Sequence, residues 1–426
     1  MFQTIVKAFK IPEVRRKILI TIALLFVYRL GCYIPVPGVD VFKGLENYNF
    51  LAIMSAVSGG ALQYGTFFAM GIGPYINASI IIQLLTVAIP ALERLSKQGE
   101  EGRKKINTYT RILTLVLAIV QSIGILVAFN NGTNVNLNAI FGAEGFAAFL
   151  SYLFLICVYT AGAALTMWIG ERITDYGVSN GISLLIFAGM ISSAGTAILD
   201  LFRYWNETSI WVIIGFVVAA ILIFAAIVTV NDAERKISVQ YAKQIKGRKM
   251  FGGQSTHIPM KVNSSGVMPL IFAFSFLSFP DLIINLLGVN PDNFWSKHMG
   301  TGSWPYMVLL CLFILFFSYF YNQIQFNADD VSKSIQQNGG FIPGTRPGKP
   351  TTDYLKRVSN RITLFGAIYL AIVALVPSVI FKAIGGVGLM NVFSATGLLI
   401  IVSVALEFEQ ALQSQIMMKN YKGFIK

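Results

Sequence analysis

The side chains that most often carry catalysis are few in this sequence, and they stand apart from one another. Its 426 residues include two histidines, His257 and His298, and three cysteines, Cys32, Cys157 and Cys311. The histidines lie outside the long apolar runs, and the cysteines lie inside or beside such runs without a metal-ligand spacing. No paired carboxylates or histidine-supported nucleophile occur midway along an apolar run, and the sequence has no Walker motif. We therefore expect no enzyme, no metal site and no cofactor.

Composition instead indicates a protein that crosses a membrane many times. The sequence is 55% hydrophobic and 12% charged, whereas soluble domains carry about 25% charged residues. Uncharged runs of roughly 20 residues, the length that a spanning helix needs, recur along it. The sequence predicts an all-α polytopic membrane protein with ten spans, near residues 18–36, 66–89, 110–129, 147–170, 179–199, 210–230, 264–288, 304–325, 361–380 and 392–413.

One early stretch does not fit a simple span. Residues 50–57 are apolar but too short to cross a bilayer, and a Gly-Gly pair follows at 59–60. Residues 66–89 carry no charge, yet they contain Gly73 and Pro74, which are poor choices for a plain lipid-facing helix. The pattern predicts a short re-entrant helix that is hinged to a full span.

Charge asymmetry predicts the orientation. Of the 33 Lys and Arg residues, one side of the ten-span arrangement holds only Lys43, Arg203, Lys297 and Lys382, and Arg29 lies inside a span. By the positive-inside rule, the other side and both termini face the cytoplasm. The chain then divides into an amphipathic N-terminal segment suited to an anionic membrane surface, two halves of five spans and a cytoplasmic tail, at residues 1–17, 18–200, 201–414 and 415–426.

Much of the basic charge falls in two long cytoplasmic loops, near residues 231–262 and 327–360. In the first loop, residues 235–241 alternate apolar and polar side chains, and residues 246–248 suit the turn of a hairpin. In the second loop, glycines and prolines surround Arg346 and Lys349. Because proline fixes φ, this tip is predicted to present its cations stiffly.

The two halves share a feature that also suits a rival class of protein. In each half the second span, around residues 73–79 and 264–275, is interrupted by Gly or Pro and carries small polar groups. Matching broken spans indicate a site between inverted repeats, as in ion-coupled secondary transporters. Against a transporter, no ionisable residue occurs at 66–89 or 262–280, although backbone carbonyls could still hold Na⁺.

Several motifs resemble the SecY/Sec61-alpha family, the channel-forming subunits of the protein-secretion translocase. In chain order they are SGGAL, FAMGIGPYINASIIIQLLTV, EEGRKKINTYTRILTLVLAIVQSIG, DYGVSNGIS, QSTHIPMKVNSSGVMP and GFIPGTRPGKPT. The resemblance covers nearly the whole chain. It implies a channel in the bacterial cytoplasmic membrane that translocates unfolded secretory polypeptides and releases hydrophobic helices laterally into the lipids. It also implies the partners SecE, SecG, the SecA ATPase, the ribosome, signal peptides and nascent chains.

The resemblance further implies an apolar ring at the waist of the pore. Its members would be Ile72, Ile76, Ile182, Ile186, Ile271 and Ala405. The first four form two i,i+4 pairs, each on one helix face. Stiff β-branched side chains would make a gasket, because a narrow apolar constriction dewets. Ordinary helix packing is the alternative interpretation. Ala405 stands where the family pattern has a larger aliphatic residue, so Ile401, one turn away, is a second candidate for that sector.

Two gating elements follow from the same resemblance. A plug at about residues 49–63 would lie beneath the ring and include Phe50, Leu51, Ile53, Met54, Gly59 and Gly60. Its alternative is a re-entrant loop at the surface. A lateral gate would separate spans two and three from spans seven and eight, with Asn77, Gln121, Ser275 and Phe279 along it. Its polar members could equally serve only to hold helices together.

A docking surface for the motor or the ribosome is implied on the cytoplasmic loops. Its residues would be Arg235, Lys236, Lys243, Arg248, Arg346 and Lys349. Such cations suit ribosomal RNA phosphates, or the carboxylates of an acidic motor surface. The alternative is membrane-proximal charge that only sets topology.

Overall fold

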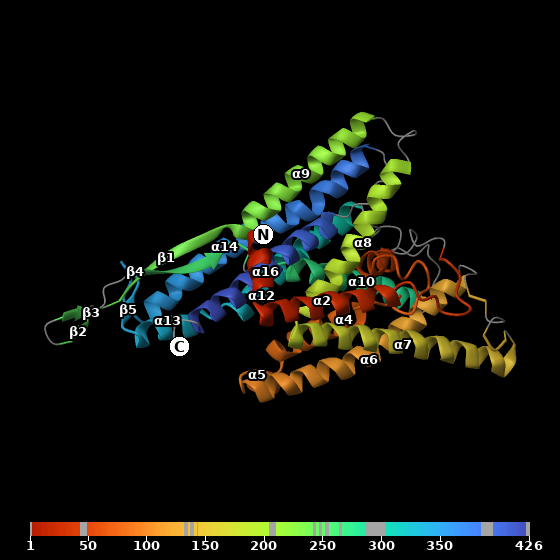
Figure 1. The fold of residues 1–426 in the computed structure, drawn as a ribbon, viewed down its shortest axis with the longest axis horizontal. Helices are drawn as coiled ribbons and strands as arrows, with labels where there is room; N and C mark the ends of the chain where they lie inside the picture. Colours follow the sequence, from red (N-terminus) through yellow and green to blue (C-terminus); the bar gives the residue numbers. More distant parts are fainter. Residues whose placement is uncertain are drawn as a thin grey trace.

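The structure is a computed structural model dominated by long helices, and Figure 1 shows α6 and α7 lying roughly along the long axis of the molecule, with α8 and α9 inclined to it. It describes residues 2–42, 49–131, 135–136, 140–142, 144–203, 210–241, 244–246, 249–251, 255–263, 266–286, 303–384 and 395–422. The helices are α1 (Phe2–Lys10), α2 (Pro12–Gly31), α3 (Asn49–Ser58), α4 (Gly73–Ala88), α5 (Pro90–Ser96), α6 (Glu100–Asn131), α7 (Gly145–Tyr176), α8 (Gly181–Arg203), α9 (Ile210–Asp232), α10 (Met268–Leu286), α12 (Trp304–Gln325), α13 (Ala328–Gln337), α14 (Lys349–Ile384) and α16 (Ala395–Lys422).

Each predicted span falls on one of these helices, in the predicted order: α2, α4, α6, α7, α8, α9, α10, α12, α14 and α16. Four helical stretches of the described residues are long and apolar enough to cross a membrane, at Glu100–Val127, Gly145–Tyr176, Trp304–Gln337 and Lys349–Val376. Taken together, α4 and α5 make a fifth stretch that is bent by 106°. A polytopic helical arrangement is therefore present, and the number of ten spans stays a prediction.

The edges of the early elements differ from the prediction. The second span starts as a helix only at Gly73, because the segment before it forms turns in which Gly71 has a φ of +51°. The span ends where Ile89 is extended, as expected for a residue before proline. The predicted N-terminal segment is also divided, since α1 ends at Lys10 and Pro12 begins α2, a position that favours proline.

The two basic loops fold together into one small unit, which is the departure from an all-α chain. Strand β1 (Glu234–Tyr241) pairs antiparallel with β4 (Ser255–Lys261) and with β5 (Gly340–Phe341) from the second loop. A core of Ile237, Val239, Ile335 and Leu355 joins this sheet to α13 and α14. Figure 1 shows the strands and α13 at one end of the molecule, which we call the strand end.

The predicted hairpin turn of the first loop is supported by strand pairing. Strands β2 (Gln244–Lys246) and β3 (Lys249–Phe251) are antiparallel, and Lys246 pairs directly with Lys249. The two residues between them, 247–248, lie outside the described part of the chain. The antiparallel pairing agrees with the predicted hairpin, and the turn itself stays a prediction.

The main core lies between the two halves of the chain. One apolar cluster includes Ile72 and Ile186 from the first half and Leu270, Ile314 and Leu399 from the second. The halves also pack directly, α8 against α16 and α6 against α10. The junction of the halves is therefore a continuous apolar layer.

The turns that precede α4 are anchored by one buried hydroxyl. Thr166 of α7 is 0% exposed, and its Oγ1 donates a 2.8 Å hydrogen bond to the carbonyl of Gly71. Nearby, Gly162 has no room for a Cβ, because that atom would meet the carbonyl oxygen of Phe67. The segment that leads to the predicted ring is thus held against α7.

We expect Thr166→Val to destabilise the protein by about 1–3 kcal/mol, because the buried Gly71 carbonyl would lose its donor. The measurement is the midpoint of thermal unfolding in detergent. Thr229→Val is the matched control, since the Thr229 hydroxyl is exposed and donates to carbonyls of its own helix. Equal midpoints for the two variants would show that the Gly71 contact contributes nothing.

Candidate functional site

The structure gathers the isoleucines of the predicted ring around the junction of the halves. Ile72 and Ile186 are buried, and Ile76, Ile182 and Ile271 are half-buried and pack against the same cluster. A Cβ placed on Gly170 of α7 would lie 3.5 Å from Cδ1 of Ile72 and 3.6 Å from Cγ1 of Ile182. These two side chains, from α8 and the start of α4, therefore both approach Gly170 of α7.

Two residues of α16 are candidates for the last sector of the predicted ring. Ile401 packs against the same apolar cluster, and Ala405, one turn further along, is half-buried. An isoleucine fills more space than an alanine, so the packing favours Ile401 as the larger contributor. That the cluster surrounds a lumen remains a prediction.

The predicted plug is a short helix, α3, followed by a tight backbone reversal. Gly59 and Gly60 have φ values of +70° and +86°, a region that favours glycine. Leu51 and Met54 are buried, whereas the side chains of Phe50 and Ile53 lie outside the described part. Helix α3 packs against α8 and α10.

The plug helix lies directly against the start of α4. The Cε atom of Met54 lies 3.3 Å from the Cβ position of Gly73, and Cβ of Ser58 lies 3.4 Å from that of Gly71. These two glycines flank Ile72. The structure therefore places the end of α3 beside the segment that carries the first ring residue.

The predicted lateral gate separates two blocks of paired helices. On one side, α10 and α12 are joined by aromatic contacts, with ring centroids 5.8 Å apart for Phe272–Phe317 and 5.0 Å apart for Phe276–Phe313. On the other side, α4 packs against α6. Across the predicted gate, α6 also packs directly against α10, so an opening there would separate α6 from α10.

One hydrogen bond crosses from α4 to α12. The hydroxyl of Tyr321 donates to Oε1 of Gln83 at 2.7 Å, and Nε2 of Gln83 donates to Oγ of Ser79 at 3.3 Å. Sequence reasoning did not single out Gln83 or Tyr321. The available signal was an uncharged polar residue within an apolar span, which usually needs a partner on another helix.

The positions of the four residues predicted along the gate say less about gating. Asn77 is buried, and Ser275 is half-buried. Gln121 is 1% exposed, and neither of its amide atoms has a hydrogen-bond partner among the described residues. The side chain of Phe279 is outside the described part. The polar contact across the proposed gate therefore runs through Gln83 and Tyr321 rather than through Gln121.

Tyr321→Phe should loosen the proposed gate. A hydrogen bond between membrane helices contributes about 0.6 kcal/mol, so its loss should shift the closed-to-open equilibrium by about threefold. We expect signal sequences of lower hydrophobicity to be exported, measured with a reporter that carries a graded series of signals. Tyr319→Phe is the control on the same helix, since the Tyr319 hydroxyl is exposed and donates to the Asn360 carbonyl. If Tyr321→Phe exports signals with the same hydrophobicity threshold as the original chain, the hydrogen bond between Tyr321 and Gln83 has no part in gating.

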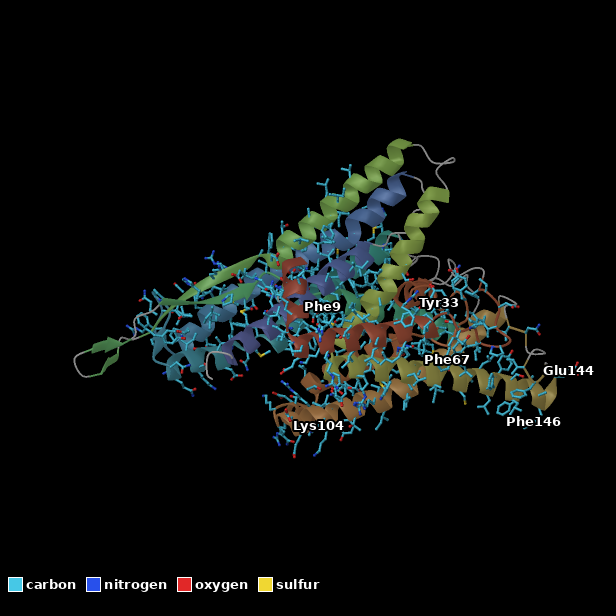
Figure 2. All side chains as sticks on the ribbon, in the orientation of Figure 1. Phe9, Tyr33, Phe67, Lys104, Glu144 and Phe146 are labelled. Carbon is cyan, nitrogen blue, oxygen red and sulfur yellow. The ribbon has the colours of Figure 1, made fainter. Side chains whose placement is uncertain are left out.

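The predicted docking surface lies at the strand end. Arg235, Lys236, Arg346 and Lys349 are exposed, and Lys243 and Arg248 lie outside the described residues. Pairing of Gln240 with Phe341 brings the two basic loops side by side. Figure 2 places Glu144 at the opposite end of the molecule from the strand end.

The tip that carries Arg346 has a fixed backbone. Thr351 Oγ1 donates to the Arg346 carbonyl at 2.8 Å, and Ser332 Oγ donates to the Gly348 carbonyl at 3.1 Å. Gly344 and Gly348 have φ values of +85° and +99°, which the turns require. The guanidinium of Arg346 is thus presented from a constrained loop.

These features define a polytopic helical membrane protein whose two halves meet at an uncharged apolar junction beside a re-entrant helix. A family model described as SecY matches residues 66–409. The protein translocase subunit SecY of Streptomyces coelicolor is 40% identical over 444 residues, covering 100% of both chains. Its counterpart in Corynebacterium glutamicum is 40% identical over 443 residues, covering 99% of both. The chain belongs to the SecY family.

Solved structures show the same fold. A protein-conducting channel matches with a TM-score of 0.70 at 18% identity, covering 94% of this chain and 92% of that one. A SecY protein whose plug domain stabilises its closed state matches at 0.63 and 18% identity, and canine Sec61 from a ribosome–channel complex at 0.64 and 16% identity, each with the same coverage. The expected polytopic channel fold is confirmed. The protein is a translocase channel subunit and not itself an enzyme.

Proposed function

We propose that the protein conducts unfolded polypeptides across the bacterial cytoplasmic membrane through the apolar ring, and that it releases hydrophobic helices sideways between the α4–α6 pair and the α10–α12 pair. The observation that carries this proposal is the meeting of Ile72, Ile182 and Ile186 in one apolar cluster beside α3. An apolar constriction excludes water and ions when it is closed. It also offers no fixed polar group that a passing chain would have to match.

The plug is suited to be displaced. Residues 49–63 carry no charge, so the segment can leave an apolar site without breaking an ion pair of its own. The glycine pair at 59–60 provides the hinge, since both residues already adopt positive φ values. A chain that enters the ring would push α3 aside while the anchored turns before α4 stay in place.

The docking surface suits an anionic partner, either the ribosome or the SecA ATPase. The exposed residues Arg235, Lys236, Arg346 and Lys349 concentrate positive charge at the strand end, and such a concentration attracts anionic surfaces. The canine relative in fold comes from a ribosome–channel complex. The SecE and SecG membrane subunits complete the proposed assembly. With the strand end in the cytoplasm, both termini face that compartment as well.

Reconstitution tests the proposed function. The chain is inserted into proteoliposomes with SecE and SecG, and a secretory precursor is supplied with SecA and ATP. The precursor should become protected from external protease, and protection should be lost when the membrane is dissolved. Failure of protection together with saturable, Na⁺-coupled uptake of a small solute would instead establish a secondary transporter.

A further inference from the structure

Arg29 is a cation near the C-terminal end of α2, directly after an uncharged run at residues 18–28, and the proposed channel function gives it no role. Charged side chains within spans are costly and usually mark a function. Its Nη2 donates to Oγ of Ser192 on α8 at 2.5 Å and to the Tyr33 hydroxyl at 3.5 Å. The guanidinium also lies 5.4 Å from the centre of the Tyr33 ring. Figure 2 shows Tyr33 on the side of the molecule away from the strand end.

The second nitrogen of the guanidinium points to the plug hinge. Nη1 of Arg29 is buried and has no hydrogen-bond partner within the described part of the chain. A Cβ on Gly59 would collide with this nitrogen and would lie 2.9 Å from the Gly189 carbonyl oxygen. Gly59 also has a φ of +70°. The hinge is therefore fitted against Arg29 with no space left for a side chain.

The C-terminal end of α3 is the natural counterpart of this cation. The last carbonyls of a helix lack intrahelical donors and carry partial negative charge, which a nearby cation stabilises. Helix α3 ends at Ser58, one residue before the glycine that Arg29 contacts. On the other side, Gly189 of α8 is so close that a Cβ there would meet the Val57 carbonyl oxygen. The end of the plug helix is thus enclosed by α8 and by Arg29.

We infer that Arg29 is the latch of the plug: its guanidinium, oriented by Ser192, holds the C-terminal end of α3 in the closed position. The inference rests on the proposed channel function. When the plug is displaced, the C-terminal end of α3 moves away from the guanidinium of Arg29, which has few other partners. Arg29 therefore favours return of the plug to the closed position. Arg29 is accordingly a positioning residue for channel closure, and it does not contact the translocating chain in this account.

Conductance of planar bilayers tests the latch. Arg29→Leu should raise the ion leak of the resting channel roughly three- to thirtyfold, the range expected when a cation at a partly buried helix terminus is removed. Arg29→Lys keeps the charge and should fall between Arg29→Leu and the original chain. Ser192→Ala removes only the orienting hydroxyl and should raise the leak in the same direction, which keeps the test informative if Arg29→Leu inserts poorly.

Deleting the plug distinguishes a latch role of Arg29 from a purely structural role. In a chain that lacks residues 49–63, Arg29→Leu should add no further leak, because its target is gone. An equal added leak with and without the plug would overturn the latch, as would an unchanged leak in the full chain. Arg172→Leu is the control for loss of a cation elsewhere, since Arg172 lies over the ring of Trp168 on α7. If the original chain passes no precursor in the proteoliposome test of the proposed function, that function fails separately from the latch.

A labelling readout reports the plug position directly. Ser55 of α3 is replaced by cysteine in a chain whose Cys32, Cys157 and Cys311 are replaced by serine. Arg29→Leu should raise the rate of Ser55→Cys labelling by a membrane-impermeant maleimide added from the outer side. A labelling rate equal to that of the parent would contradict the latch even if the leak had changed.

Discussion

Replacing Ile72 and Ile76 by glycine will make the resting channel leak ions, with a conductance at least about tenfold above that of the original chain. Ile72 lies directly before α4 and Ile76 lies in its first turn, and both belong to or pack against the same apolar cluster. Removing two β-branched side chains opens a hydrated path where the constriction would otherwise dewet. The measurement is single-channel conductance in planar bilayers without precursor.

The control variant must distinguish loss of the apolar constriction from a general weakening of a helix by glycine. Glycine costs roughly 1 kcal/mol in a helix interior, wherever it is placed. Ile368→Gly on α14 carries that cost, but its side chain is exposed at 46% on the outside of the bundle. We expect no leak from Ile368→Gly. A double glycine variant that stays as tight as this control would count against the ring.

Arg346→Glu is expected to leave the protein folded and inserted, and to reduce motor-driven export by at least about tenfold. The backbone around Arg346 is held by the hydrogen bonds from Thr351 and Ser332, so the substitution reverses the charge on an unchanged loop. An acidic partner surface that attracts the guanidinium through charge-assisted hydrogen bonds would repel the carboxylate. SecA-dependent translocation of a precursor into vesicles measures the effect.

Two further variants test whether geometry or charge matters at this position. Arg346→Lys keeps the charge but loses the planar fork, so a partial defect would indicate bidentate recognition of a carboxylate or phosphate. Lys333→Glu on α13 is a charge-reversal control on an exposed helix of the same unit. Normal export by Arg346→Glu, or an equal defect in Lys333→Glu, would remove the special role of Arg346.

Sequence periodicity predicted the order and approximate places of the long helices because uncharged runs of sufficient length have few other stable structures in a bilayer. It placed their ends less well. Helix α6 begins at Glu100, ten residues before the apolar run, because charged residues such as Lys104 and Lys105 favour helix in water as readily as apolar ones do in lipid. The turns before α4 were predicted as helix, since their apolar composition does not reveal the positive φ of Gly71.

Contacts between distant segments could not be predicted in the same way. The hydrogen bond from Tyr321 to Gln83 joins residues 238 positions apart. The sequence around each of the two residues does not identify the other as its partner. The approach of Arg29 to Gly59 likewise depends on how α2, α3 and α8 pack. The ring isoleucines were assigned through family resemblance, because isoleucine at i,i+4 spacing occurs in ordinary helix packing too.

The central claim is that a polypeptide passes between the two halves of this chain at an apolar constriction. Cysteine cross-linking to a stalled secretory chain tests it most directly, in a protein whose three native cysteines have been replaced. A cysteine at Ile182, and separately at Ile186, should cross-link to a cysteine in the middle of the stalled chain, whereas one at Ile368 on the exposed face of α14 should not. Cross-linking at Ile368 with none at Ile182 or Ile186 would contradict the account.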